Sequence, residues 1–288
     1  MLGEVPQLLV NGVVAGTVLA VPAIGFTAIY AVLRFPNFTI ASHATIGAFA
    51  GYVANTVGGW PAAAAVVAAF VVAGAFGVVN DELVLKPLRP AGALTTAIAA
   101  IALTIVLENV VRFVFGNDLR GYDLPIRRDW HVGGIRIGPQ QVENLVIAAI
   151  AMGALFLFLA FTRTGKAMRA VADNPMLAGI KGIDADRVAR LVNFFAMGLA
   201  GVGGMLLGLD TSIDPLMGFR VILSVFAAAV VGGLGSIPGA VVGALTVGIG
   251  EEISLLVLAP SYRTAVGFVA ILLVLTLRPR GILGERAY

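Results

Sequence analysis

RTGKAMRAVADNPMLAGIKGIDADRVAR, residues 163–190, is a polar stretch between two apolar runs that are each long enough to cross a membrane. It contains six lysine or arginine residues and three aspartates. Charged side chains are costly in lipid, so we expect this stretch to lie in water. Its excess of positive charge favours the cytoplasmic side of a membrane. The segment 163–190 is therefore predicted to be a cytoplasmic connection between two membrane-spanning segments.

The composition of the whole chain is typical of a membrane protein. Of its 288 residues, 59% are hydrophobic and 12% are charged, whereas soluble domains have about 25% charged residues. No polar stretch is long enough to form a separate soluble core, so we expect a single transmembrane domain over 1–288. The net charge of +3 fits cytoplasmic loops rather than nucleic-acid binding. Because the chain has no cysteine, disulfide bonds and thiolate metal sites are excluded.

Nine apolar runs are candidates for membrane-spanning helices, which need about 20 mostly apolar residues. They are 6–33, 38–57, 62–85, 92–115, 141–162, 188–209, 219–234, 238–257 and 263–278. Two of them, 38–57 and 219–234, are short or polar enough to be broken or re-entrant. The predicted fold is all-α, a polytopic helical membrane protein with eight or nine transmembrane or re-entrant helices.

The distribution of positive charge also predicts the orientation of the chain. Arg34, the loop 80–91, the segment 163–190 and the C-terminal tail should lie in the cytoplasm. With nine crossings, the N-terminus is then outside and the C-terminus is cytoplasmic. The loop 116–140 falls outside, where three aspartates offset its four arginines. Its Tyr122 and Trp130 are candidate interface anchors, or contacts for an extracytoplasmic partner.

Two segments interrupt helix continuity, RFPNFTIAS (34–42) and GGLGSIPGA (232–240). Proline removes a backbone donor, and glycine adopts unusual dihedral angles. Transporters place such breaks along their translocation path, but a cytoplasmic turn between two helices is the alternative for both segments. Small polar side chains around the first break are candidates for a weak translocation path: Asn37, Thr39, Ser42 and Thr45.

Charged residues inside apolar runs are informative because they are costly in lipid. Glu108 and Arg112 are four residues apart in the run 92–115, and we expect them to form a structural salt bridge on one helix. Glu251 and Glu252 lie inside the run 238–257. We expect one of these two to face protein or the pathway, with a partner at the helix end as the alternative.

The sequence lacks the motifs of a catalyst. It contains no G-x-x-x-x-G-K-[ST] run for binding ATP and no H-E-x-x-H run for binding zinc, and it has only two histidines. We therefore expect no catalytic, cofactor-binding or metal-binding residues in this chain.

The segment 163–190 has the form of a docking element. Asn174-Pro175 favours a turn or a new helix start, so we expect one or two short helices lying across the membrane face. A solvated loop held by salt bridges is the alternative. The apolar residues of the segment form one set: Met168, Ala170, Val171, Met176, Leu177 and Ile180.

Four motifs in this chain resemble one family. GKAMRAVADNPMLAGIKGIDADRV (165–188) is similar to the cytoplasmic coupling loop of ABC importer permeases, which reads G-[RK]-A-x-R-A-x-A-[ED]-[ND] and continues to A, G-I and D-R-V. GGLGSIPGAVVGALTVGIGEE (232–252) resembles G-G-x-G-S-x-x-G-A-x-x-G, and RPRGILG (278–284) resembles R-P-x-G-[IL]-x-G. PNF (36–38) resembles an N-F motif after the first span. In order and spacing the motifs resemble the branched-chain amino acid permease family over nearly the whole chain.

One position departs from that family. Where the family commonly reads N-F-A-H-G-[ED], this chain has no acidic residue between Asn37 and Ser42. Relatives of the family are implicated in the import of other amino acids, amides, urea and small organic acids, so these solutes remain alternatives to a branched-chain amino acid.

The resemblance implies a membrane-spanning permease subunit of an ATP-driven importer, which forms the translocation path for branched-chain or related amino acids and is not itself an enzyme. The implied partners are a second homologous permease, two cytoplasmic ATPase subunits and an extracytoplasmic solute-binding protein. The implied location is the plasma (inner) membrane of a prokaryote. No cofactor is expected in this chain, because ATP and Mg²⁺ belong to the partner subunits.

The resemblance also assigns roles to residues. The coupling segment is expected to cover 163–187, and the residues implied to contact an ATPase subunit are Arg169, Ala170, Asp173, Asn174, Ala178 and Gly182. Small residues let helices approach closely in lipid, so glycines of the second motif are predicted to pack helices, within the chain or against the second permease. These are Gly232, Gly233, Gly235, Gly239 and Gly243.

Two other classes of transporter compete with this interpretation. A secondary transporter driven by an ion gradient would need charged relays within the membrane, for which Glu251 and Glu252 are the candidates. A passive channel for a small neutral solute would work without partners. Neither class explains a docking segment at 163–190.

Overall fold

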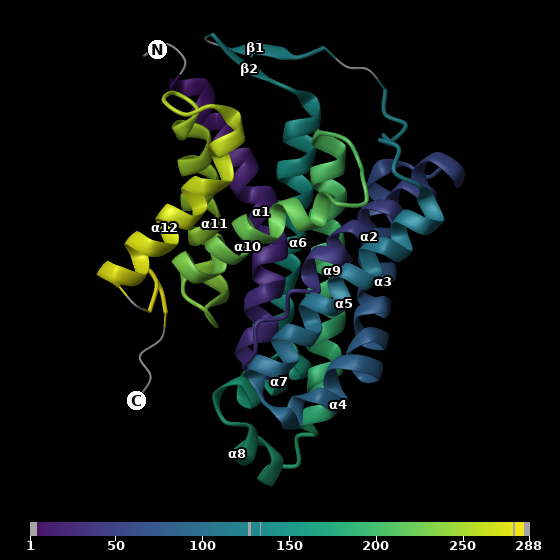
Figure 1. Cartoon of the computed structure of the whole chain (residues 1–288), viewed down its shortest axis with the longest axis vertical. Helices are drawn as coiled ribbons and strands as arrows, with labels where there is room; N and C mark the ends of the chain where they lie inside the picture. The colour runs from purple at the N-terminus through teal and green to yellow at the C-terminus, as the bar shows by residue number, and fades with distance from the viewer. Residues whose placement is uncertain (1–4, 126–127, 133, 279, 285–288) are drawn as a thin grey trace.

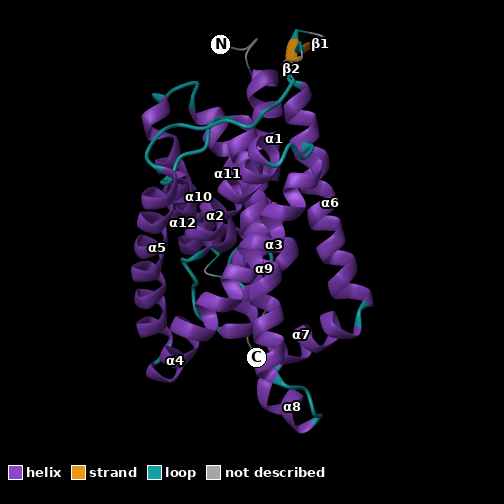
Figure 2. Cartoon of the chain, turned by 90° about the vertical axis from the view of Figure 1, so that its right-hand side faces the viewer, coloured by secondary structure: helices purple, strands orange, loops and turns teal. Residues whose placement is uncertain are grey.

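The computed structural model describes residues 5–125, 128–132, 134–278 and 280–284. It confirms the prediction of an all-α polytopic membrane protein, since helices dominate the described chain (Figure 2). Among the described residues, six helical stretches are long and apolar enough to cross a membrane. They are α1 (Val5–Leu33), α3 with its continuation (Ala62–Ala91), α5 (Ala93–Phe115), α6 (Pro139–Phe161), α9 (Ala185–Asp210) and α11 (Ile237–Ser254).

Every one of the nine predicted runs contains a helix, but three of the helices are short. They are α2 (Ile40–Tyr52), α10 (Met217–Gly232) and α12 (Arg263–Leu277). Helix α2 continues as the π-helical turn η1 (Val53–Val57). At 1.5 Å per residue, 13 to 16 residues are shorter than the roughly 30 Å hydrocarbon core. The two runs that looked broken or re-entrant, 38–57 and 219–234, are therefore among the short helices.

Helices α1 and α9 form the centre of the bundle. In both, 78% of the most apolar stretch is buried within the protein, against 17% in α6. Glycines allow this packing, because a Cβ on Gly204 would collide with the backbone of Ala44 in α2, and one on Gly25 would meet Ala196 of α9. Helices α5 and α6 lie on opposite sides of the bundle (Figure 2), with outward apolar faces suited to lipid.

The break at 34–42 is real, and it leaves α2 to begin inside the bundle. The N–H of Arg34 closes the last turn of α1 by donating to Tyr30, and Arg34 adopts a left-handed backbone with φ 58°. Helix α10 crosses the bundle obliquely (Figure 1). Its start meets α2 directly, since the N–H of Gly218 donates to Thr45 Oγ1 at 3.1 Å.

One end of the molecule carries the loop 116–140, which contains a small antiparallel hairpin of β1 (Trp130–Val132) and β2 (Ile135–Ile137). This hairpin is a minor exception to the all-α prediction. Tyr122 turns inward and donates to the carbonyl of Ala48 at 2.9 Å, so it is a structural contact rather than an interface anchor. Trp130 is 55% exposed.

The opposite end carries α7 (Arg163–Asp173) and α8 (Pro175–Ile180), which lie below the bundle in Figure 1. The same end contains the continuation of α3 through η2 (Asp81–Leu85), α4 (Lys86–Leu88) and η3 (Arg89–Ala91). A short helical turn, η4 (Pro260–Tyr262), precedes α12. The prediction of one or two short helices in the segment 163–190 is confirmed, since the segment forms α7 and α8 before α9 begins.

Candidate coupling and translocation sites

Helix α7 is anchored to the bundle through one apolar face. Thr162 caps its start by accepting a hydrogen bond from the N–H of Gly165 at 2.9 Å. Met168 and Val171 are 4% and 3% exposed and belong to the main hydrophobic core. Arg169 is exposed on the other side, so α7 presents its charge to water and its apolar face to the membrane domain.

Helix α8 turns its apolar side chains outward. Asn174 caps the helix by accepting a hydrogen bond from the N–H of Leu177 at 3.0 Å, and Pro175 occupies the first turn, where its missing N–H costs nothing. Met176, Leu177 and Ile180 are 79%, 54% and 76% exposed. The sequence grouped these side chains with Met168 and Val171, but the structure separates a buried apolar set on α7 from an exposed apolar set on α8.

The residues predicted to contact an ATPase are divided between these surfaces. Arg169, Asp173, Asn174 and Gly182 are exposed, and Ala170 is half-buried. Ala178 is only 4% exposed and packs into the core. Gly182 adopts φ 80° just beyond α8, where a left-handed residue closes the helix. The exposed residues Met176, Leu177 and Ile180 were not assigned this role from the sequence, because apolar periodicity does not tell which helix face is covered.

A side chain from the break after α1 reaches the end of α7. Arg34 Nη2 donates to the carbonyl oxygen of Ala172 at 2.6 Å. This carbonyl lies in the last turn of α7, where backbone acceptors lack partners within the helix. A guanidinium at a helix C-terminus is also favourable to the helix dipole. Arg34 therefore connects the segment that precedes α2 to the docking helices.

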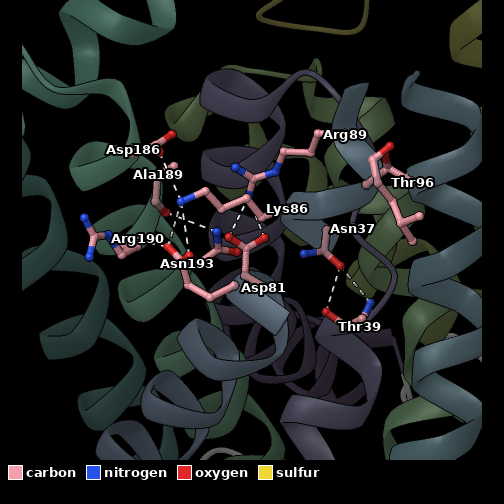
Figure 3. Close-up of polar contacts among 12 residues, drawn as sticks. Asn37, Thr39, Asp81, Lys86, Arg89, Thr96, Asp186, Ala189, Arg190 and Asn193 are labelled. Carbon is pink, nitrogen blue, oxygen red and sulfur yellow. Dashed lines mark hydrogen bonds and ion pairs between the residues drawn. The ribbon is translucent and has the colours of Figure 1, made fainter. Parts of the chain in front are cut away.

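A network of charged residues joins the ends of α3 and α9 at the same end of the molecule (Figure 3). Lys86 Nζ lies 3.1 Å from Glu82 and 3.0 Å from Asp186. Arg89 binds Asp81, which is 1% exposed, with oxygen contacts of 2.5 Å. This network was not predicted from the sequence, although the charged residues at 81–89 and 184–190 are a signal for it.

Asp184 caps the start of α9 beside that network. Its carboxylate accepts hydrogen bonds from the N–H groups of Asp186 and Arg187 at 3.0 and 3.2 Å. These bonds, above all the one from Arg187, lower the pKa of Asp184 below its ordinary value of 3.8.

The structure brings the predicted path residues together at the start of α2, all four with 1% exposure or less. Asn37 Oδ1 accepts hydrogen bonds from the N–H and the hydroxyl of Thr39 at 3.1 and 2.7 Å. Ser42 donates to Thr39, and Thr45 accepts from Gly218 of α10. Asn37 Nδ2 has no hydrogen-bond partner within the described ranges of the chain. Most of these groups thus stabilise the helix start, and the Asn37 amide keeps an unused donor.

The glycines of the second motif pack within the chain. An added Cβ on Gly232, Gly239 or Gly243 would collide with the backbone where α10 and α11 cross. Gly233 and Gly235 have φ of 111° and 93° and form the turn 232–240 between these helices.

The third motif closes over this turn. The N–H groups of Ile282 and Leu283 donate to the carbonyls of Val231 and Gly232 at 2.8 and 2.9 Å. The described residues of 278–284 therefore dock onto the end of α10.

A second charged cluster joins α10, α11 and α12. Arg263 lies 3.4 Å from Glu251 and 2.6 Å from Glu252, and Ser224 of α10 donates to Glu251 at 2.6 Å. Both glutamates are buried in the protein, and both have the ion-pair partner that was the alternative to a pathway role.

Comparisons with known proteins agree on one family. The model of the family "Branched-chain amino acid transport system / permease component" matches residues 8–277. The chain is 35% identical to the high-affinity branched-chain amino acid transport system permease protein LivH of Escherichia coli (strain K12), over 97% of this chain and 95% of that protein. It is 32% identical to the permease protein BraD of Pseudomonas aeruginosa over the same shares. A probable permease protein LivH of Methanocaldococcus jannaschii is 30% identical, over 98% and 93% of the two chains.

Proposed function

The chain belongs to the permease family of branched-chain amino acid transport systems, and from this premise we propose that it is one membrane subunit of an ABC importer. In this role it forms part of the translocation path for branched-chain or related amino acids. Its relatives carry such transport in their names and match nearly the whole chain, which supports the assignment.

The observation that carries the docking part of the proposal is the exposed apolar surface of α8. Met176, Leu177 and Ile180 stand on a segment rich in charge, outside the apolar bundle. Apolar side chains gathered on a water-facing surface are typical of a protein interface. We assign this surface to a cytoplasmic ATPase subunit, with Arg169, Asp173, Asn174 and Gly182 around it.

The remaining partners follow from the same role. A second, homologous permease completes the path, and two ATPase subunits supply ATP and Mg²⁺, so this chain needs no cofactor. A solute-binding protein delivers the solute at the end with the β1–β2 hairpin. The chain lies in the inner membrane of a prokaryote, with the N-terminus outside and the C-terminus in the cytoplasm, because the basic segments then face the cytoplasm.

Two alternatives are separated by their energy source and solute. An importer of urea, an amide or an organic acid would keep the ATPase partners but would not accept leucine. A secondary transporter or channel would move solute without ATP. The ion pairs of Glu251 and Glu252 with Arg263 weigh against a free charged relay in that region.

Co-purification tests the proposal most directly. The tagged chain is isolated from its native membrane, its partners are identified by mass spectrometry, and ATP-dependent uptake of leucine is measured in proteoliposomes. We expect two ATPase subunits and a second permease with the wild type. The double variants Arg169→Glu/Asp173→Arg and Met176→Gln/Ile180→Gln should lose the ATPase subunits.

The matched control is Leu119→Gln, which alters a residue that is 71% exposed on the loop at the opposite end. This variant should keep the ATPase subunits. A chain that purifies alone and moves leucine without ATP would replace the importer with a secondary transporter or channel.

A further inference from the structure

Helix α5 carries a buried glutamate and an arginine that each have one buried polar atom without a hydrogen-bond partner in the described part of the chain. Glu108 is 5% exposed, and the unpartnered atom is its Oε1. Arg112, one helical turn further along, has a buried Nε that is also without a hydrogen-bond partner. The ion pairs of the described residues do not include one between Glu108 and Arg112, so the predicted salt bridge is wrong, and an acceptor and a donor are unused. Charged groups inside a membrane-spanning helix are costly and mark functional sites.

Glu108 lies on the face of α5 that packs against the bundle. The buried residues of α5 recur every three or four positions and include Ala100, Thr104, Glu108 and Val111. Phe113 and the other outward apolar residues are exposed. The carboxylate of Glu108 therefore faces protein rather than lipid.

Two contacts set the level of Glu108 along α2. The hydroxyl of Thr104 donates to the carbonyl of Phe38 at 3.2 Å, and the rings of Phe115 and Phe49 pack with centroids 4.5 Å apart. Phe38 and Phe49 are separated by the same number of residues as Thr104 and Phe115. The segment containing α2 therefore runs parallel to α5, with the same rise along both segments. Glu108, four residues beyond Thr104, is consequently level with Ser42, four residues beyond Phe38.

We propose that Glu108 and Arg112 form an intramembrane site for the charged groups of a zwitterionic amino acid in transit. The inference rests on the proposed function and names the chemistry of its substrate. The α-ammonium group donates to Glu108 Oε1, and the α-carboxylate accepts from the Nε–H of Arg112. Residues four apart on a helix have Cβ atoms about 5–6 Å apart, a spacing that suits two charged groups on one carbon atom.

The site also explains how an amino acid passes without tight binding. Glu108 and Arg112 attract one another when the site is empty. The bound substrate replaces this attraction with its own ionic contacts, so the net gain in binding free energy is small. Solutes without both charges, such as urea or a neutral amide, can still hydrogen-bond to the two side chains, but they gain less than a zwitterion because neither hydrogen bond joins two charged groups. The Glu108–Arg112 pair therefore selects against the neutral solutes that the sequence alone left open.

The experiment measures leucine uptake per ATP hydrolysed by the complete importer in proteoliposomes, with the melting temperature of each variant. In Glu108→Gln/Arg112→Gln both charges disappear together, so neither is left unpaired and the melting temperature should be unchanged or raised. Uptake per ATP should fall by about tenfold or more, since two charge-assisted hydrogen bonds to the substrate are lost. Arg112→Lys, which keeps the charge but loses the Nε–H, should give a smaller loss and serves if the double variant fails to assemble.

The control is Glu252→Gln, which breaks a closed ion pair with Arg263. It should lower the melting temperature and leave uptake per ATP unchanged. Wild-type uptake per ATP in the double variant would overturn the site, and so would a loss that merely follows the melting temperature. If the wild-type importer takes up no leucine with ATP, the proposed function fails first, and this inference fails with it.

Discussion

At the scale of single residues, Asn174 caps the exposed helix α8. Its Oδ1 caps α8, a helix of only six residues, by accepting from the N–H of Leu177. Asn174→Ala should destabilise α8 by about 1 kcal/mol, because a capping acceptor is lost. Faster amide hydrogen exchange in 175–180 and weaker retention of the ATPase subunit would report this change. Asn174→Asp keeps the acceptor and should behave like the wild type; equal exchange in all three proteins would contradict the prediction.

Asp184 makes the start of α9 sensitive to acid. Its folded pKa is lowered, chiefly by the hydrogen bond from the N–H of Arg187. A lowered folded pKa means that the ionised form stabilises the fold above the ordinary value of 3.8 and that this contribution is lost as pH falls through the folded pKa. The protection factors for amide exchange at residues 185–188, which correct for the pH dependence of intrinsic exchange, should therefore fall as the pH drops below about 4. In Asp184→Asn, which accepts the same hydrogen bonds but does not titrate, this component should be absent.

At the scale of elements, glycine contacts determine how closely helices pack. Gly204 of α9 touches the backbone of Ala44 in α2, whereas Gly153 of α6 has open space where a Cβ would stand. Gly204→Ala should destabilise the protein by about 1–3 kcal/mol, since two backbones must separate. Gly153→Ala, the matched control, should be neutral or stabilising by up to about 1 kcal/mol because alanine favours helix. Thermal unfolding in detergent measures both, and similar melting temperatures for the two variants would refute the packing role of Gly204.

The connection between α7 and the break before α2 depends on Arg34. Glycine adopts φ 58° without strain, so Arg34→Gly removes the hydrogen bond to Ala172 while keeping the local backbone. We expect amide exchange in α7 to accelerate by about threefold, the effect of one modest hydrogen bond. Uptake per ATP should fall while ATP hydrolysis continues, because movement of α7 is no longer passed to the segment 34–39. Unchanged uptake per ATP would show that α7 acts through other contacts; Arg34→Lys should be intermediate.

At the scale of the whole molecule, the charged network holds the ends of α3 and α9 together. Lys86 bridges Glu82 of η2 and Asp186 of α9, and a transport cycle that moves these helices must open this bridge. The chain has no cysteine, so Lys86→Cys/Asp186→Cys introduces a unique pair for a short bifunctional maleimide. Cross-linking should stop uptake, whereas the unlinked double variant should still transport. Full transport by the cross-linked protein would mean that the ends of α3 and α9 stay together during the cycle.

In the candidate sites, features set by the local sequence could be predicted, whereas features set by contacts between distant elements could not. The segment 163–190 could be assigned to water and to two short helices, because its charges and Asn174-Pro175 act locally. The direction in which α8 presents Met176 and Ile180 depends on contacts with other elements. The apolar periodicity of the segment therefore could not predict that these side chains are exposed. In the same way, the spacing of Glu108 and Arg112 predicts a salt bridge, and only the structure shows that each keeps a buried atom without a partner among the described residues.

Composition, charge and motif order by themselves determined the class of protein, the helices of the bundle, the breaks at 34–42 and 232–240, and the family. These properties follow from local physical rules, since lipid requires apolar helices and excludes charge wherever it is not paired. Only the tertiary structure decided that α2 and α10 start against one another, that the tail closes the glycine-rich turn, and that the charges of α3 and α9 meet. Such contacts join residues far apart in the chain, and their partners are set by packing geometry rather than by any local pattern.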